Sequence, residues 1–239
     1  MIPLEARGIV RTFGGLVALD GVDLDVPAGQ VTALIGPNGA GKSTLFACLA
    51  GQLRPDRGRV LMAGVDVTHL APDARARRGL ARTFQRLAIF GSLTVADNVR
   101  IAAENTERRR RDVDEQVATV LDLLGLSSVA STLAATLPTG TLRLVELARA
   151  LAGQPRVVLL DEPTSGLDDA QADRVPLAVR AMADTGRSVV IVEHDLPLVF
   201  AAADVVHVLA QGRIVASGTP VQVQADPALA AAFAIGAGA

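Results

Sequence analysis

Short apolar runs alternate with helix-like patterns along the chain. Residues Val31–Ile35 and 157–160 are nearly continuous apolar runs, which is typical of strands covered on both faces of a sheet. Further strand-like runs lie at 22–26, 58–63, 189–192, 205–209 and 213–216. Strands separated by helices predict an α/β fold with a mainly parallel core sheet. The apolar–polar alternation of 22–26 predicts a half-buried strand in an antiparallel β edge region.

Helical spacing without any strand fills the stretch from Gly91 to Leu137. Thr94 begins one helix as its cap, and the apolar positions of 106–125 recur at helical spacing. We therefore predict one domain whose core comprises 1–90 and 142–220. A helical lobe, 91–141, is inserted into this core, and a tail, 221–239, follows it. Further helices are expected at 42–51, 72–79 and 142–153, and Pro176 either lies in the first turn of a helix starting near Arg174 or kinks a longer one.

Composition narrows the possible functions. The chain of 239 residues has a formal net charge of -2, so nothing indicates a general nucleic-acid-binding protein. Its single cysteine excludes an internal disulfide and fits a reducing compartment. We see no signal peptide at the N-terminus and no apolar run long enough to cross a bilayer. Any membrane work is therefore expected to go through partners. Lys42 is the only lysine in the chain.

A glycine-rich segment joins the strand Val31–Ile35 to the helix that follows it. Residues 36–44 match the phosphate-loop pattern G-x-x-x-x-G-K-[ST], in which backbone N–H groups and a helix N-terminus bind phosphates. Lys42 is expected to bridge the β- and γ-phosphates, Ser43 to ligate Mg²⁺ and Thr44 to bind the α-phosphate. The predicted nucleotide-binding residues of this loop are Gly36, Pro37, Asn38, Gly39, Ala40, Gly41, Lys42, Ser43 and Thr44.

Two carboxylates end the apolar run 157–160. Asp161 is placed to hold Mg²⁺ through its water shell, because this ion rarely sheds all its waters. Glu162 is placed to orient and deprotonate the attacking water. The two segments together predict hydrolysis of a nucleoside triphosphate with Mg²⁺. ATP as that nucleotide, and hence an ATPase with ATP and Mg²⁺ as cofactors, rests largely on a family resemblance.

These motifs resemble the nucleotide-binding subunits of ABC transporters over nearly the whole chain. The resemblance implies that Gln85 senses Mg²⁺ and contacts the membrane subunit, with both a catalytic and a metal-binding role. It implies that His194 contacts the γ-phosphate and that Asp168 reaches across a dimer. Phe13 matches the aromatic residue that stacks on adenine.

One segment departs from the family. The lobe motif that is usually L-S-G-G-Q reads Leu137-Pro138-Thr139-Gly140-Thr141, so the serine hydroxyl and a backbone N–H are lost. Gly140 is retained as a nucleotide contact. In the family this motif acts on the ATP held by the opposite subunit. We therefore expect a heterodimer with a second ATPase whose motif is intact, although a homodimer is possible.

The segments 13–19 and 81–85 look most like the ATPases of branched-chain amino acid and related amide importers, whereas 74–79 is similar to the lipopolysaccharide-export ATPase. The resemblance implies permease subunits and a solute-binding protein as partners, and a place on the cytoplasmic face of the membrane. Two alternatives are a different P-loop enzyme and a poorly hydrolysing regulatory clamp. A GTPase would need an N-K-x-D motif, which a chain with Lys42 as its sole lysine lacks.

Overall fold

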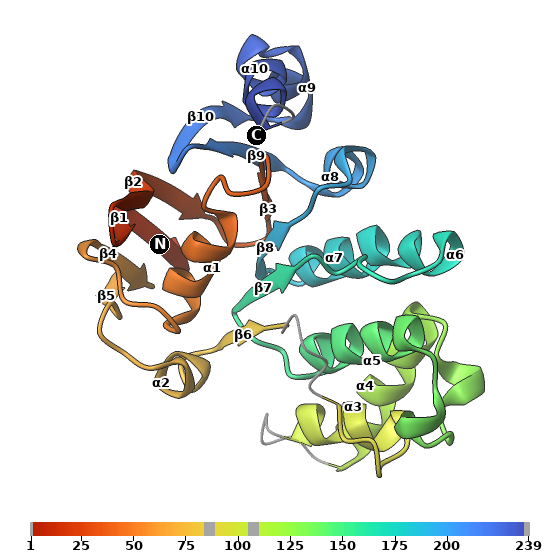
Figure 1. The fold of residues 1–239 in the computed structure, drawn as a ribbon. Helices are drawn as coiled ribbons and strands as arrows, with labels where there is room; N and C mark the ends of the chain where they lie inside the picture. The colour runs from red at the N-terminus through yellow and green to blue at the C-terminus, as the bar shows by residue number, and fades with distance from the viewer. Residues whose placement is uncertain (1, 84–88, 105–109, 237–239) are drawn as a thin grey trace.

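The computed structural model describes residues 2–83, 89–104 and 110–236. A six-stranded sheet forms the centre of the fold (Figure 1). Four of its five pairings are parallel, which confirms the mainly parallel core, and the β9–β10 pairing is an antiparallel hairpin. In spatial order the strands are β10 (Arg213–Gly218), β9 (Val205–Ala210), β3 (Val31–Ile35), β8 (Ser188–Val192), β7 (Val157–Asp161) and β6 (Leu80–Arg82).

A second, antiparallel sheet confirms the predicted edge region. Its strands in order are β2 (Leu16–Val26), β1 (Leu4–Phe13), β4 (Arg57–Met62) and β5 (Val65–Asp66). Strand β1 was not predicted from the sequence. Its pairing register shifts between Ala6 and Ile9, where Gly8 takes a φ of 58°. The bulge interrupts the period-two alternation by which a strand is recognised.

Helix α1 (Lys42–Ala50) packs between the two sheets. Its buried side chains share one apolar cluster with the inner faces of β1, β2 and β4 and with Leu34, Leu159 and Val190 of the central sheet. The opposite face of the central sheet is covered by α7 (Arg174–Asp184) and α8 (Leu196–Ala202), whose apolar residues join a larger cluster. Helix α6 (Asp169–Ala172) precedes α7, which begins at Arg174. Pro176 therefore lies in the first turn of α7, which was one of the two expectations for this residue.

The helical lobe is inserted between β6 and β7, after the short helix α2 (Pro72–Ala76). It contains α3 (Val95–Glu104), α4 (Arg110–Leu123) and the single-turn 3₁₀ segments Ser127–Val129 and Ala134–Thr136. Thr94 caps α3, its hydroxyl accepting a 3.1 Å hydrogen bond from the Asp97 N–H. Helix α5 (Thr139–Ala152) packs against α3 and α4 and crosses the expected lobe boundary at residues 141 and 142, because it begins directly after Pro138 rather than at Leu142.

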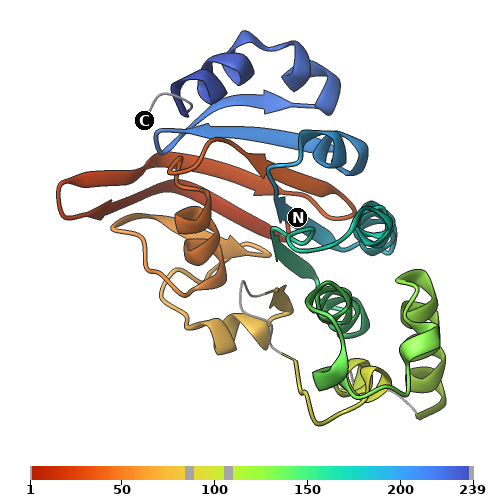
Figure 2. The same ribbon diagram turned by 45° about the vertical axis from the view of Figure 1, so that its right-hand side comes forward.

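The chain ends in two helices, α9 (Pro220–Ala225) and α10 (Pro227–Gly236), which pack on β9 and β10. Ala232 of α10 is buried in the larger apolar cluster, with Leu229 and Phe233 packed against it. Figures 1 and 2 show these helices at the upper end of the molecule, whereas the lobe projects from the lower end. Within the part of the chain that the structure describes, no helix is both long and apolar enough to span a membrane.

Candidate functional site

The loop 36–41 follows β3 at its carboxyl end and leads into the N-terminus of α1. Two of its glycines are required by close approach. A Cβ atom at Gly36 would lie 2.0 Å from the Leu209 carbonyl oxygen, and one at Gly41 would lie 2.4 Å from that of Ala18. Gly41 is also the N-cap of α1, with a φ of 107° that L-residues rarely adopt. At Gly36 and Gly41 the backbone therefore runs too close to neighbouring carbonyl oxygens for any side chain.

The hairpin between β9 and β10 supports the loop from outside. Gln211 and Gly212 both have positive φ, as a type I′ turn requires. The Gly212 N–H donates to the Ala40 carbonyl at 2.9 Å, and the Gly212 carbonyl accepts from the Asp20 N–H at 2.9 Å. One residue of the hairpin, Gly212, thus ties the phosphate loop to β2.

Lys42 lies at the first turn of α1 with its ammonium folded back over the loop. Its Nζ donates to the carbonyl oxygens of Gly36 at 2.5 Å and Pro37 at 2.9 Å. Burial lowers the pKa of Lys42, and the negative charges of Glu162 and Asp161 oppose this effect. The ammonium is therefore close enough to both predicted carboxylates to be stabilised by them. Of the next two predicted residues, Ser43 is exposed and Thr44 is half-buried.

Asp161 is the last residue of β7 and its side chain is almost completely buried. The carboxylate oxygen Oδ2 accepts a 3.0 Å bond from Nη2 of Arg82, at the end of the neighbouring strand β6. The Asp161 backbone N–H donates to the Thr83 hydroxyl at 3.2 Å. Sequence reasoning did not find Arg82, because the pair joins residues 79 positions apart.

Glu162 takes the first position after β7, where the backbone turns sharply. Its φ is 46°, a left-handed conformation that costs a non-glycine residue on the order of 1–3 kcal/mol. The Glu162 N–H donates to the Val192 carbonyl at 2.9 Å, which fixes the turn to the end of β8. Such strain is concentrated at functional sites, and this residue is the predicted base.

The end of β8 carries His194 and a buried neighbour that sequence reasoning missed. Glu193 is fully buried and accepts bonds from the backbone N–H of Thr164 at 3.0 Å and from its hydroxyl. Its second oxygen accepts from the His194 N–H at 3.2 Å, while the His194 side chain is 68% exposed. Glu193 therefore joins the turn after Glu162 to the residue expected to contact the γ-phosphate. A charged residue directly after a buried strand was the available signal.

Three neighbouring parallel strands bring these residues to one edge of the sheet. The loop follows β3, His194 comes two residues after β8, Asp161 ends β7 and Glu162 directly follows it. The carboxyl ends of parallel strands are where ligands bind in open α/β sheets. Gln85 lies outside the described residues.

Phe13 lies on a different element, at the end of β1. Its side chain is 45% exposed, and the guanidinium carbon of Arg11 lies 4.8 Å from its ring centroid. Phe13 pairs across the β1–β2 hairpin with Leu16. An aromatic ring that stays accessible at a hairpin end can stack on a planar base.

A second group forms where α5 meets α6. Asp168 is the N-cap of α6 and makes a reciprocal capping box with Gln171. The Gln171 side-chain amide also donates to the Thr141 hydroxyl at 3.4 Å. A Cβ atom at Gly140 would lie 2.4 Å from Oε1 of Gln171, so Gly140 is in close contact with the same side chain. The structure thus brings Gly140 and Asp168 together through Gln171, which the sequence alone did not indicate.

Pro138 removes fewer hydrogen-bond donors from the segment 137–141 than the sequence alone suggests. It is the N-cap of α5, outside the helix proper, so its missing N–H removes no helical hydrogen bond. The first N–H groups of a helix have no intrahelical acceptor. In α5 these are the N–H groups of Thr139, Gly140 and Thr141. The segment therefore keeps backbone and hydroxyl donors that an anion can use.

The residues present fit Mg²⁺ rather than a metal held by side chains alone. Among the residues that the structure describes, no group of three or more His, Cys, Asp or Glu side chains could hold a metal ion. Mg²⁺ is commonly bound by one or two protein oxygens together with waters and phosphates. The Ser43 hydroxyl and the buried Asp161 carboxylate, beside a loop shaped for phosphates, supply such a donor set.

Comparison with known proteins agrees with this geometry. The family model described as ABC transporter matches residues 19–165, more than half of the chain. The high-affinity branched-chain amino acid transport ATP-binding protein BraF of Pseudomonas aeruginosa is 35% identical, and LivG of Escherichia coli K12 is 31% identical. Each alignment covers 96% of this chain and 96% of the relative.

A solved structure of the same kind matches the fold. The crystal structure of the ADP conformation of MJ1267, an ATP-binding cassette of an ABC transporter, superposes with a TM-score of 0.83 at 32% identity. The superposition covers 98% of this chain and 99% of that chain. With the phosphate loop, the two carboxylates and the fold all in place, this chain belongs to the ABC transporter family as an ATP-binding subunit, an ATPase whose hydrolysis is coupled to transport.

Proposed function

We propose that this chain powers the uptake of branched-chain amino acids or related small polar solutes. The observation that carries the proposal is the similarity to BraF and LivG, two branched-chain amino acid transport ATP-binding proteins, over 96% of each chain. The sequence 74–79, similar to the lipopolysaccharide-export ATPase, supports export as the alternative.

In this proposal the loop 36–44 holds the triphosphate, and Phe13 stacks on adenine. Lys42 leaves the loop carbonyls to bind the β- and γ-phosphates, because phosphate oxygens are stronger acceptors for an ammonium. Ser43, Asp161 and Gln85 hold Mg²⁺, which would supply positive charge to the phosphates. Glu162 orients the attacking water and accepts its proton, and His194 contacts the γ-phosphate.

The working unit in this proposal is a dimer that sandwiches two ATP molecules. Gly140 and Asp168 act on the nucleotide of the opposite subunit. Loss of the serine at Pro138 favours a different ATPase as partner, while the donors kept by Thr139 and Thr141 leave a second copy of this chain possible. Hydrolysis by the chain alone that equals hydrolysis by the pair would contradict the heterodimer.

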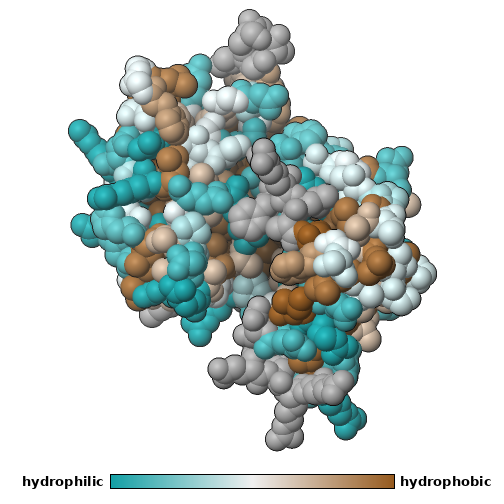
Figure 3. All heavy atoms as spheres, turned by 60° about the horizontal axis from the view of Figure 1, so that its bottom comes forward, coloured by the Kyte–Doolittle hydropathy of each residue, from teal (hydrophilic) through white to brown (hydrophobic). Residues whose placement is uncertain are grey.

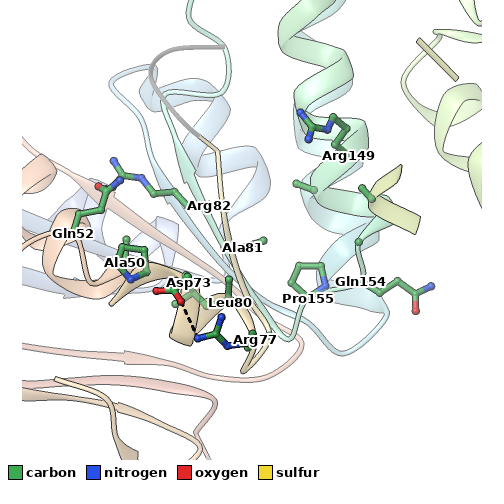
Figure 4. A pocket seen from close by; sticks show the side chains of 16 residues that line it. Ala50, Gln52, Asp73, Arg77, Leu80, Ala81, Arg82, Arg149, Gln154 and Pro155 are labelled. Carbon is green, nitrogen blue, oxygen red and sulfur yellow. Dashed lines mark hydrogen bonds and ion pairs between the residues drawn. The ribbon is translucent and has the colours of Figure 1, made fainter. Parts of the chain in front are cut away.

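A cleft between the core and the lobe is the proposed docking site for the permease. A cavity of about 600 Å³ lies there, lined by α2, β6 and the C-terminal end of α5. Figure 4 shows Gln52, Arg82 and the Asp73–Arg77 ion pair on the core side and Arg149 on α5 across from them. Figure 3 shows apolar patches beside hydrophilic ones on one side of the molecule. In this proposal the chain works at the cytoplasmic face of the membrane with permease subunits and a solute-binding protein.

The test is uptake of radiolabelled leucine by cells of the source organism that lack this chain. Restoring the chain is expected to restore uptake, and restoring the Glu162→Gln variant is not. Uptake that is the same with and without the chain would overturn the import proposal. Loss of surface lipopolysaccharide in the same cells would support the export alternative instead. Equal activity of the variant and the unmodified chain would support the regulatory clamp.

A further inference from the structure

The carboxylate expected to serve Mg²⁺ already has a positively charged partner from its own chain. The Arg82 guanidinium lies 3.0 Å from Asp161 Oδ2, and the two side chains are only 12% and 1% exposed. A buried carboxylate without a counter-charge is strongly unfavourable, so Arg82 fulfils this need when no metal is bound.

Arg82 is held by the phosphate-loop helix as well. Its guanidinium carbon lies 5.2 Å from the ring centroid of Phe46 in α1, and its Nη1 donates to the side chain of Gln52, just beyond the end of that helix. Its Nε is buried without a hydrogen-bond partner within the described part of the chain. The guanidinium therefore reaches from α1 to β7, with one donor unsatisfied in this position.

A second cation at Asp161 has to share the carboxylate with Arg82. Two positive charges within a few ångströms in a poorly solvated site repel each other strongly. By thermodynamic linkage, if Mg²⁺ weakens the Arg82–Asp161 pair, the pair weakens the binding of Mg²⁺ by the same factor. We propose that Arg82 is the counter-ion of Asp161 in the metal-free chain and competes with Mg²⁺ for it. Arg82 is thus a positioning residue that sets how strongly Mg²⁺ adds to nucleotide affinity. The inference rests on the proposed role of Asp161 in binding Mg²⁺.

The experiment measures ATP affinity by calorimetry on the full chain, in excess Mg²⁺ and in EDTA. The quantity compared is the ratio of the two affinities, which isolates the contribution of the metal. Arg82→Gln is expected to raise this ratio at least about fivefold, the lower end of typical coupling between sites. Arg82→Lys, which keeps the charge, is expected to raise it less. The control Arg180→Gln removes an ion pair with Asp204 that belongs to neither nucleotide-binding group, and is expected to leave the ratio unchanged.

A ratio that is unchanged or lower in Arg82→Gln would overturn the inference, and a lower ratio would mean that Arg82 orients Asp161 for the metal. Gln52→Ala loosens the anchor of Arg82 without removing charge, and should raise the ratio even if Arg82→Gln fails to fold. An unchanged ratio in that variant would also count against the competition.

The variant Asp161→Asn separates this inference from the proposed function. If Asp161→Asn leaves the ratio of the unmodified chain intact, the proposed metal site itself is wrong. If Asp161→Asn lowers the ratio and Arg82→Gln does not change it, only the competition is wrong. In the Asp161→Asn background, Arg82→Gln is expected to have no effect on the ratio.

Discussion

Replacing Arg75 by methionine should destabilise the fold through the phosphate-loop helix. The Arg75 side chain is fully buried, although it is charged. Its Nη1 donates to the carbonyl oxygens of Cys48 and Leu49 at 2.7 Å, at the C-terminal end of α1. Its Nε and Nη2 donate to the carbonyls of Leu70 and Thr68 at 3.2 Å. The cation thus satisfies the negative end of the helix whose positive end faces the phosphates.

The magnitude follows from the acceptors that are left behind. Methionine keeps most of the volume but removes every donor. Four carbonyls lose the bond that Arg75 supplied. The Cys48 carbonyl keeps a bond from the Gly51 N–H, so the cost falls on the other three. Each unsatisfied buried acceptor costs about 1–3 kcal/mol. The variant also avoids burying a charge, a cost that is visible in the lowered pKa of Arg75. We expect a net loss of about 2–4 kcal/mol in the free energy of unfolding.

Urea unfolding followed by circular dichroism measures this loss. The matched control is Arg77→Met, because Arg77 forms an exposed pair with Asp73, and solvent screening leaves such a pair little effect on stability. MgATP affinity should fall only a few-fold in Arg75→Met, since Arg75 acts on the far end of α1. A change below about 1 kcal/mol would refute the view that buried carbonyls at this helix end need the guanidinium.

Three further predictions concern the site and its surroundings. Glu162→Gln should lower the turnover number by at least about 100-fold with MgATP affinity kept, because it removes the base but not the phosphate loop; equal single-turnover rates would contradict this. Gly36→Ala should abolish ATP binding in calorimetry, since its Cβ would lie 2.0 Å from the Leu209 oxygen. Burial raises the pKa of Cys48 from 9.0 to about 11, so the folded chain binds this proton more tightly than the unfolded chain. Its contribution to stability is therefore complete below pH 9 and is lost as the pH rises toward 11. The urea midpoint should fall less over this pH range in Cys48→Ala than in the unmodified chain, and an equal fall in both would contradict the prediction.

The sequence predicts those parts of the site that are contiguous along the chain. The loop 36–44 and the pair Asp161 and Glu162 carry their chemistry in one short segment each, so spacing alone finds them. Arg75, Arg82 and Glu193 each have at least one partner 26 or more positions away, and no local pattern encodes such pairs. The same limit applies to the fold.

Strand β1 escaped prediction because a bulge breaks its alternation, and α5 began earlier than expected because proline is well tolerated just outside a helix N-terminus. The buried strands β3, β7 and β8 were found because parallel strands covered on both faces read as apolar runs, independent of their partners.

The bond between Gly212 and Ala40 has a consequence for the biosynthesis of the protein. The phosphate loop is made early, yet the peptide unit that supports it lies about 170 positions later, and the Leu209 carbonyl that confines Gly36 comes just before. A growing chain on the ribosome therefore carries the loop sequence long before it can hold its final shape. We expect the nascent polypeptide to bind nucleotide only after residues 209–212 have been synthesised and have folded against the loop, so that shorter nascent chains neither bind nor hydrolyse ATP.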